Sequence, residues 1–393
     1  MSLPKIFTRI SSTHLLPILL VLATFLSIFY FYSTIRLNSQ NSLLAQAKST
    51  LEKELEVTKA DFTAIKETDQ VKRNDALQEE ISNIQKTYSG ALSTYEKLLD
   101  AGKLGKADKV SEDFAKVLKL LSDKNYATAS SVLSELNKGL ETTQAKVATE
   151  FKVPMNLPES SQPPTSGYSR QKVNTDSGGF MVDIISADLN STRVIVDTAS
   201  ESDCGNDCPV LSLGEYVSRN GAFAGINGSF FCPSTYPSCA GKTNSFDTLL
   251  MNKDKKYFNS DNNVYSVVQA AIFGSGWARF IGRSLEWGRD TGVDAVIANY
   301  PLLVSGGQSN FSGSDDGKLT GRGSRTFIGA KDSTVYIGIV HNATSAEGAK
   351  VLQTMGLHNA LGLDQGGSTA LWYGGYKAGP CRQIPNAILF VRR

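Results

Sequence analysis

The chain has 393 residues, of which 41% are hydrophobic, enough to bury the cores of two or three domains. It carries 40 basic and 38 acidic side chains, and this near balance excludes nucleic-acid binding driven by a large positive charge. Lysines and glutamates crowd the first 150 residues, whereas glycines and aromatic residues crowd the remainder. This shift in composition indicates two parts with different roles.

An almost uninterrupted apolar segment occupies residues 15–35, after a short tail at 1–14. It contains no charged residue, and at about 1.5 Å per helical residue it can cross a hydrocarbon layer about 30 Å thick. Tyr30 and Tyr32 stand near its outer end, where amphipathic rings favour the membrane interface. A cleaved signal peptide is the alternative, but the bulky end lacks small residues for cleavage. The segment is therefore predicted to be an uncleaved single-pass anchor.

The orientation of this anchor follows from weak but concordant signals. Lys5 and Arg9 precede the apolar segment and Arg36 follows it, a slight basic excess that favours a cytoplasmic N-terminus. The bulk of the chain is then predicted to be extracytoplasmic. Because such compartments are oxidising, disulfide bonds are expected there.

All five cysteines lie in the C-terminal part, and four of them form two close pairs. The spacings lack the two-residue knuckles typical of zinc sites, and no histidine lies nearby, so no metal site is predicted. Local disulfides are the simpler explanation. The predicted pairs are Cys204 with Cys208 and Cys232 with Cys239, which leaves Cys381 as a free thiol or an intermolecular partner.

Residues 36–151 are predicted to be mainly helical. Apolar side chains recur every three or four residues between lysines and glutamates, which is helical periodicity. The glycines of 101–105 end the first long helix, and two shorter amphipathic helices follow around 110–121 and 126–140. The pattern fits a stalk or coiled coil that pairs with a second copy as a homodimer. An intramolecular helical bundle fits it equally well.

Residues 152–174 form a linker rich in proline and serine, and residues 175–393 form the C-terminal domain. Short β-strand patterns dominate this domain and two helices interrupt them, one starting near Ser212 and one capped at Ser345. The predicted fold class is α+β with mixed sheets. The expected strands are 180–185, 192–196, 294–298, 335–340, 359–363 and 387–391.

A carboxylate follows the apolar strand at 359–363. Asp364 is succeeded by Gln365, two glycines and two hydroxyl residues, and such a loop can expose successive N–H groups to an anion. Taken alone, a strand closed by a Gly-Gly turn is more often simple architecture. The functional interpretation therefore depends on other segments.

Five segments in this order resemble the phosphodiester glycosidase family: 224–231, 299–304, 322–329, 363–371 and 379–388. The resemblance covers residues 175–393 and leaves the anchor and the helical part outside. It implies a hydrolase acting on a sugar 1-phosphodiester of the N-acetylglucosamine type, within phosphosugars or polysaccharides of the cell surface. No cofactor is predicted, and metal dependence stays open.

The chemistry of such a substrate suggests a role for each matching residue. A departing phosphate needs cations, and the oxocarbenium-like centre needs a carboxylate. Asp364 is the predicted nucleophile, stabiliser or base, with Arg325 and His341 as further catalytic candidates; each of these three also has a purely structural interpretation. The predicted substrate- and phosphate-binding residues are Asn227, Arg382, Gly366, Gly367, Ser368 and Thr369.

Two positions depart from the family pattern. Gln365 stands where relatives have the first of three glycines, and Gly362 stands where an asparagine commonly precedes the Leu-Asp pair. A side chain at position 365 can narrow the anion site or contact substrate. The alternative function is therefore a glycan-binding or scaffolding module that holds its ligand without cutting it.

Overall fold

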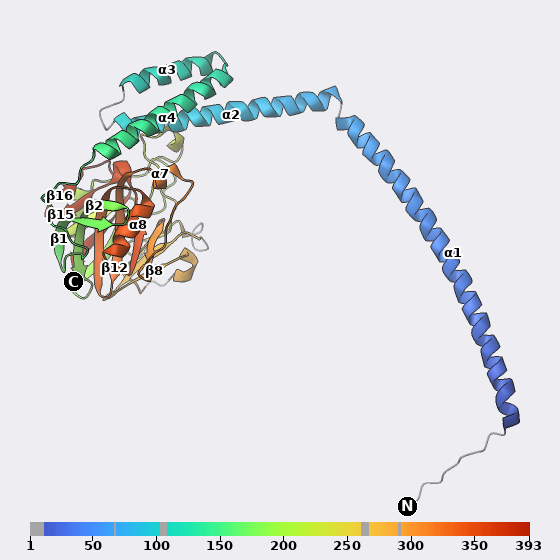
Figure 1. Ribbon diagram of the computed structural model, residues 1–393. Helices are drawn as coiled ribbons and strands as arrows, with labels where there is room; N and C mark the ends of the chain where they lie inside the picture. Colours follow the sequence, from blue (N-terminus) through green and yellow to red (C-terminus); the bar gives the residue numbers. More distant parts are fainter. Residues whose placement is uncertain (1–11, 67, 103–107, 261–266, 290–291) are drawn as a thin grey trace, which may run out of the picture. The chain divides into compact units, whose positions relative to one another are not determined.

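The computed structural model describes residues 12–66, 68–102, 108–260, 267–289 and 292–393. It divides into two compact units, residues 1–84 and 85–393. Figure 1 shows the helices and strands along the sequence.

The first unit consists of α1 (Ser12–Lys66) and the beginning of α2 (Asp69–Gly102). From Leu20 onward, α1 is long and apolar enough to cross a membrane, and none of this window is buried in the protein. A signal sequence meets the same criterion, so anchoring stays a prediction. The expected single long helix is in fact two, because α1 ends at Lys66 and α2 begins at Asp69. The coiled coil also stays a prediction.

In the second unit the end of α2 packs with α3 (Asp108–Ser122) and α4 (Tyr126–Glu150). A side-chain hydrogen bond connects α4 to α2, because Asn137 Nδ2 donates to Thr94 Oγ1 at 2.9 Å. This part of the predicted helical region is therefore an intramolecular bundle. Its buried side chains are Ala91, Leu98, Phe114, Val117, Leu121, Ala129, Leu133 and Leu136.

The β domain contains a seven-stranded sheet. In spatial order its strands are β1 (Gly167–Thr175), β2 (Gly178–Asp188), β13 (Thr334–Ala343), β12 (Gly323–Lys331), β14 (Asn359–Gly362), β10 (Leu302–Ser305) and β11 (Gln308–Ser309). Because β1 already pairs with β2 from Gly167 onward, the sheet begins inside the stretch expected to be linker.

Two five-stranded sheets complete the domain. The first is ordered β16 (Tyr376–Ala378), β15 (Leu371–Tyr373), β4 (Ala224–Asn227), β17 (Asn386–Arg392) and β3 (Thr192–Thr198). The second is ordered β6 (Tyr257–Phe258), β5 (Leu250–Met251), β9 (Ala295–Ala298), β7 (Ala270–Gly274) and β8 (Trp277–Ile281). Neighbouring strands within these three sheets pair antiparallel throughout the described residues, so the expectation of mixed sheets was wrong.

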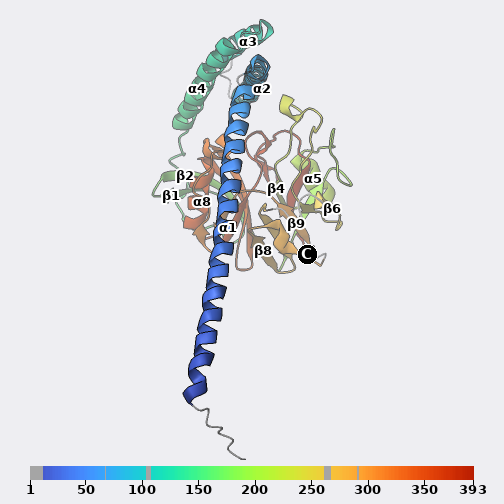
Figure 2. The same ribbon diagram turned by 90° about the vertical axis from the view of Figure 1, so that its right-hand side faces the viewer.

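The main hydrophobic core lies between the sheets and draws on all three, with Ile337, Ile388 and Ile297 as examples. Helix α8 (Ser345–Thr354) packs on the seven-stranded sheet through a second cluster, as Figure 1 shows near β2 and β12. Its N-cap is Thr344 rather than the expected Ser345. Helix α5 (Leu213–Asn220) packs against β4 and β17, and Figure 2 shows it on the side of β4 and β9.

Short helical turns and two disulfides complete the described part of the domain. The predicted pairs Cys204–Cys208 and Cys232–Cys239 are both bonded, and the half-buried Cys381 belongs to neither disulfide. The second disulfide closes a loop that contains a 3₁₀ turn at Pro237–Cys239. This loop approaches the candidate site described next.

Candidate active site

Asp364 follows β14 at a point where three strands converge. Its backbone N–H donates to the Gly228 carbonyl at 3.0 Å. Its own carbonyl accepts from Asn227 Nδ2 at 2.7 Å and from the Thr326 hydroxyl. Asn227 ends β4 of the first five-stranded sheet, and Thr326 belongs to β12 of the seven-stranded sheet. The backbone of Asp364 is therefore fixed by both of these sheets. The carboxylate is therefore carried on a rigid frame.

The side chain of Asp364 has few direct partners. The Gln365 N–H donates to Oδ1 at 2.8 Å, and the Ser368 hydroxyl donates a second hydrogen bond to the carboxylate. Burial disfavours the charged form and raises the pKa of Asp364 to about 6, against the smaller opposing effects of these bonds and of the Arg382 and Lys318 charges. At neutral pH this residue is a carboxylate that keeps a strong tendency to bind a proton or positive charge.

The loop after Asp364 brings unsatisfied donors beside it. It makes a 3₁₀ turn (η3, Gly366–Ser368) in which Gly366 has a φ of +61°, a conformation that glycine adopts without strain. The Gly367 carbonyl accepts the Arg382 N–H at 3.2 Å, which places Arg382 next to the turn. Within the described residues the buried atoms Thr369 Oγ1 and Arg382 Nε have no hydrogen-bond partner. Two orphaned donors at one turn suit an anion.

Arg382 has aromatic and acidic neighbours on its other side. Its guanidinium lies over the Tyr236 ring, 5.1 Å from the ring centroid, and Nη2 is 3.7 Å from Asp100 Oδ1. The Tyr236 hydroxyl donates to Asp100 Oδ2 at 2.6 Å. Burial raises the pKa of Tyr236 to about 12, and the hydrogen bond to Asp100 adds to this effect. Helix α2 thus supplies a carboxylate to the candidate phosphate-binding arginine.

Asn227 lies behind the loop that follows Asp364 rather than at its surface. The residue is fully buried, its amide nitrogen donates to the Asp364 carbonyl, and its oxygen accepts the Ala370 N–H at 3.1 Å. Both ends of the loop are therefore fastened by one side chain. Asn227 thus fixes the backbone that carries the Asp364 carboxylate, and its predicted contact with substrate stays a prediction.

Arg325 is also directed away from the loop. Its guanidinium donates to the carbonyls of Ala343 at 2.7 Å, Lys318 at 2.9 Å and Gly321. Burial lowers the pKa of Arg325 to about 10. These bonds join β12 to β13 and to the short helix α7 (Gly317–Thr320). Arg325 has a structural role here, and no contact among the described residues supports its predicted catalytic role.

His341 belongs to a second buried cluster that the sequence analysis missed. Its Nε2 is 2.7 Å from Asp183 Oδ2, and Arg170 and Tyr168 donate to the same carboxylate at 2.7 Å and 2.6 Å. Burial acts to raise the pKa of Asp183, but these hydrogen bonds outweigh it and lower that pKa to about 2. The only signal in the sequence is a lone carboxylate within the apolar strand 180–185.

Strand register places this second cluster near the first. Asp183 pairs with Ile339, and Ile339 pairs with Thr326, whose hydroxyl bonds the Asp364 carbonyl. Paired residues point to the same face of a sheet, and two strand spacings span about 10 Å. His341 has the same parity as Ile339 and a side chain 14% exposed. The cluster therefore flanks the candidate site on the same face.

No metal centre is visible in the described part of the chain, where histidine, cysteine, aspartate and glutamate side chains do not gather in groups of three. The arrangement is instead an isolated carboxylate beside an arginine and a glycine-rich turn. Such a site can bind an anionic group and stabilise positive charge next to it.

Comparison with known proteins agrees with this chemistry. Residues 220–391 match the model of the phosphodiester glycosidase family. No curated protein matches the chain at a significant level. Among solved structures, the zebrafish N-acetylglucosamine-1-phosphodiester alpha-N-acetylglucosaminidase catalytic domain aligns with a TM-score of 0.46 and 16% identity over 60% of this chain and 87% of that one.

A hypothetical protein from Synechocystis aligns with a TM-score of 0.40 and 14% identity, over 57% of this chain. The alignment spans 62% of that protein's length. The strands β1 and β2, which carry Arg170 and Asp183, precede the residues matched by the family model. The family match itself contains Asp364, Ser368 and Arg382, and so the chain contains a phosphodiester glycosidase domain at residues 220–391.

Proposed function

We propose that this chain is a membrane-anchored, extracytoplasmic hydrolase that cleaves a sugar 1-phosphodiester in surface glycans. The observation that carries the proposal is the meeting of two loops, where the buried carboxylate of Asp364 lies beside the orphaned donors of Thr369 and Arg382. Its position inside the family domain supports this reading. The apolar α1 supports the anchor.

The reaction breaks the bond between the anomeric carbon and the phosphate oxygen. The oxygen of water ends on the sugar carbon, a phosphate monoester departs with the bonding electron pair, and the proton that water loses passes to the departing phosphate or to the solvent. Because the second pKa of such a monoester is about 6, the leaving group needs little protonation at neutral pH. The enzyme then needs chiefly a carboxylate at the developing positive charge, and ionised Asp364 supplies it.

The departing phosphate would be held on the other side of the loop. Arg382 and the Thr369 hydroxyl supply side-chain donors, and the backbone N–H groups of Gly366 and Gly367 complete the proposed anion site. Phosphate would compete with Asp100 for the guanidinium of Arg382. Ser368 keeps the carboxylate of Asp364 oriented toward the anomeric carbon.

His341 is proposed to act from the flank of the site. Asp183 fixes its ring through Nε2, so the other ring nitrogen keeps a defined direction. In this role His341 donates a hydrogen bond to substrate or exchanges a proton with water. Asp183, Arg170 and Tyr168 act through His341 and are positioning residues.

A substrate panel tests the proposal. The full chain in detergent is incubated with the methyl diester of N-acetylglucosamine α-1-phosphate and with phosphoglycan fractions, and released sugar and phosphomonoester are measured. We expect both products from the wild type and none from Asp364→Asn. The control Asp332→Asn changes an exposed carboxylate and should keep activity.

Two outcomes would contradict hydrolysis. Equal turnover by the wild type and Asp364→Asn would remove Asp364 from the mechanism. Calorimetric binding of the diester with no product after long incubation would instead identify a glycan-binding module.

A further inference from the structure

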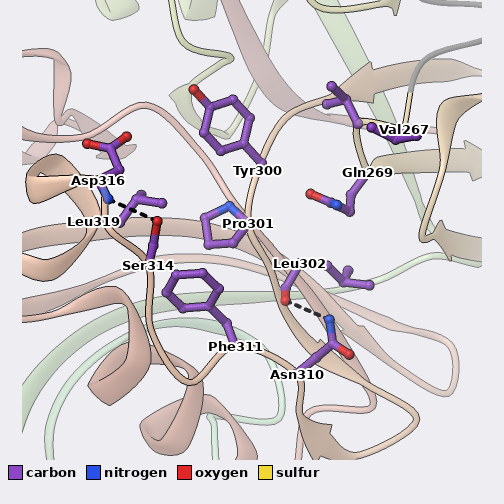
Figure 3. A pocket seen from close by; sticks show the side chains of 11 residues that line it. Val267, Gln269, Tyr300, Pro301, Leu302, Asn310, Phe311, Ser314, Asp316 and Leu319 are labelled. Atoms are coloured by element: carbon purple, nitrogen blue, oxygen red, sulfur yellow. Dashed lines mark hydrogen bonds between the residues drawn. The ribbon is translucent and has the colours of Figure 1, made fainter. Parts of the chain in front are cut away.

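A pocket of about 470 Å³ opens beside the candidate site. Its walls come from three segments: residues 267–269 before β7, residues 300–302 at the start of β10, and the loop 310–319. Its volume lies in the range of about 300–1,000 Å³ that is typical of small-molecule sites. Figure 3 shows Tyr300 and Pro301 in the centre, with Phe311 below them, Asp316 and Ser314 to the left and Gln269 to the right.

Two observations connect this pocket to Asp364. A Cβ atom at Gly362 would lie 3.1 Å from Pro301 Cδ, and the Gly362 N–H donates to the Pro301 carbonyl at 2.9 Å, so the floor of the pocket rests two residues from Asp364. In addition, Tyr300 is near enough to Asp364 to feel its charge. Burial raises the pKa of Tyr300, and the carboxylates of Asp316, Asp247 and Asp364 add to the effect.

The lining combines apolar faces with a few polar groups. Tyr300 is 40% exposed and its ring is braced by Phe230, with ring centroids 4.9 Å apart. Its hydroxyl is protonated at neutral pH, as is usual for tyrosine, and can donate. Gln269 extends its amide toward Tyr300 and Pro301, and its buried Oε1 has no hydrogen-bond partner among the described residues. An acceptor without a donor, next to an exposed ring, indicates a ligand with its own donor.

We propose that this pocket is the subsite for the pyranose ring of the substrate, with Tyr300 packing against the ring and Gln269 Oε1 accepting from a donating substituent. The inference rests on the proposed function. If the phosphate lies on Arg382 and the anomeric carbon lies at Asp364, the ring needs a pocket next to Asp364, and the pocket of Tyr300 and Pro301 is next to it. The donating substituent is a hydroxyl or an amide N–H.

Steady-state kinetics with the full chain test this subsite. The variants are Tyr300→Ala, Tyr300→Phe and Gln269→Met, each assayed with the methyl diester of N-acetylglucosamine α-1-phosphate and with its glucose counterpart. Dimethyl phosphate serves as an inhibitor that carries the phosphodiester without a sugar. The matched controls are Trp277→Ala, which removes an aromatic ring of similar exposure, and Gln353→Met on the surface.

We expect Tyr300→Ala to raise KM about tenfold with little change in kcat, and Tyr300→Phe to keep most of the affinity because the ring remains. The inhibition constant of dimethyl phosphate should stay the same in every pocket variant. If Gln269 reads the acetamido group, Gln269→Met should weaken only the N-acetylglucosamine substrate; if it reads a hydroxyl, both substrates should weaken alike.

Failure of the subsite is distinguishable from failure of the proposed function. Turnover by the wild type with unchanged KM in Tyr300→Ala and Gln269→Met would overturn the subsite alone. If the wild type shows no turnover, calorimetry with methyl N-acetyl-α-glucosaminide decides the question. Weaker binding by Tyr300→Ala than by the wild type would uphold the subsite, and equal or absent binding by both would reject it.

Discussion

Asp364 and Asp183 are two buried aspartates on neighbouring parts of one β domain, and their environments act on ionisation in opposite directions. Asp183 is fully buried, but Arg170, Tyr168 and His341 all bond its carboxylate, and its pKa falls to about 2. Asp364 is 8% exposed and has only an N–H and a hydroxyl as direct partners, and its pKa rises to about 6. Burial alone does not decide the state of a carboxylate; direct cationic and hydrogen-bond partners do.

The difference separates an acid whose charge is neutralised within the fold from an acid whose charge has no cationic partner in contact. The charge of Asp183 is already satisfied within the fold, so it has little left to offer a substrate. The positive charges of Arg382 and Lys318 act on Asp364 without contacting its carboxylate. The charge of Asp364 is therefore available to a developing positive centre. The predictions below test this contrast.

The largest effect should follow from Asp364→Asn. We expect turnover of the methyl diester to fall by about a thousandfold or more, because the charge that opposes the oxocarbenium-like centre is lost. At pH 7.5 the thermal midpoint should stay level or rise, since a buried carboxylate with no ionic partner in contact costs free energy. Product release and calorimetric melting measure the two quantities. A lower midpoint would show that Asp364 is structural.

Asp183→Asn should produce the reverse pattern. Its removal leaves Arg170 and His341 without their anionic partner, and we expect a loss of about 2–4 kcal/mol in the free energy of unfolding. Arg170 is 41% exposed, so water limits the loss. Urea titration measures it, with Asp332→Asn as the exposed control. An unchanged midpoint would place Asp183 outside the stabilising network.

The pH dependence should differ in sign between the two residues. Because the pKa of Asp183 is lowered in the folded state, its stabilisation is present above about pH 4 and is lost as the pH falls toward 2. Because the pKa of Asp364 is raised, its contribution is present below about pH 4 and is lost as the pH rises through 6.

Stability curves of the single variants separate the two windows. Asp364→Asn should remove the loss between pH 4 and 6, and Asp183→Asn should flatten the curve below pH 4. In the wild type, kcat/KM should rise with pH up to about 6 and then level, because the ionised form of Asp364 is the active one. A rate that falls through this range would assign Asp364 as an acid.

A smaller effect is expected from Ser368→Ala. The Ser368 hydroxyl stabilises the charged form of Asp364, so its removal should raise the pKa of that carboxylate further. The midpoint of the pH–rate profile should move upward by up to about one unit, since a hydrogen bond to a charged group contributes about 1.5 kcal/mol. Ser368→Cys should also move the midpoint upward, because a thiol is a weak hydrogen-bond donor. Ser368→Thr should keep the midpoint, because it retains the hydroxyl. An unmoved midpoint in Ser368→Ala would reject the hydrogen bond.

Contiguous features of the site could be predicted from the sequence. Asp364, Ser368 and the two glycines lie within five residues, so local chain geometry alone brings them together. The two disulfides could also be predicted from the sequence, because each closes a short loop. The helix positions near Ser212 and Ser345 followed from caps and glycines, with an error of one residue at Thr344.

Features that depend on distant pairing could not be predicted. Asp183 and His341 meet across 158 positions of sequence, and only the register of β2 and β13 joins them. Whether Asn227 and Arg325 face the solvent or the interior depends on the sheets packed around them. Composition gave no information on the antiparallel pairing of the sheets, because buried strands of either kind have similar apolar patterns.

The contact between Asp100 and Arg382 bears on how the domain is studied in isolation. A fragment cut in the proline-rich segment retains all of residues 220–391 but loses α2 and its carboxylate. In the fragment the positive charge of Arg382 would no longer be compensated by Asp100. The fragment would therefore bind inorganic phosphate more tightly than the intact chain does. Product inhibition measured on such a fragment would therefore overstate that of the whole protein, although every residue of the matched family domain is present.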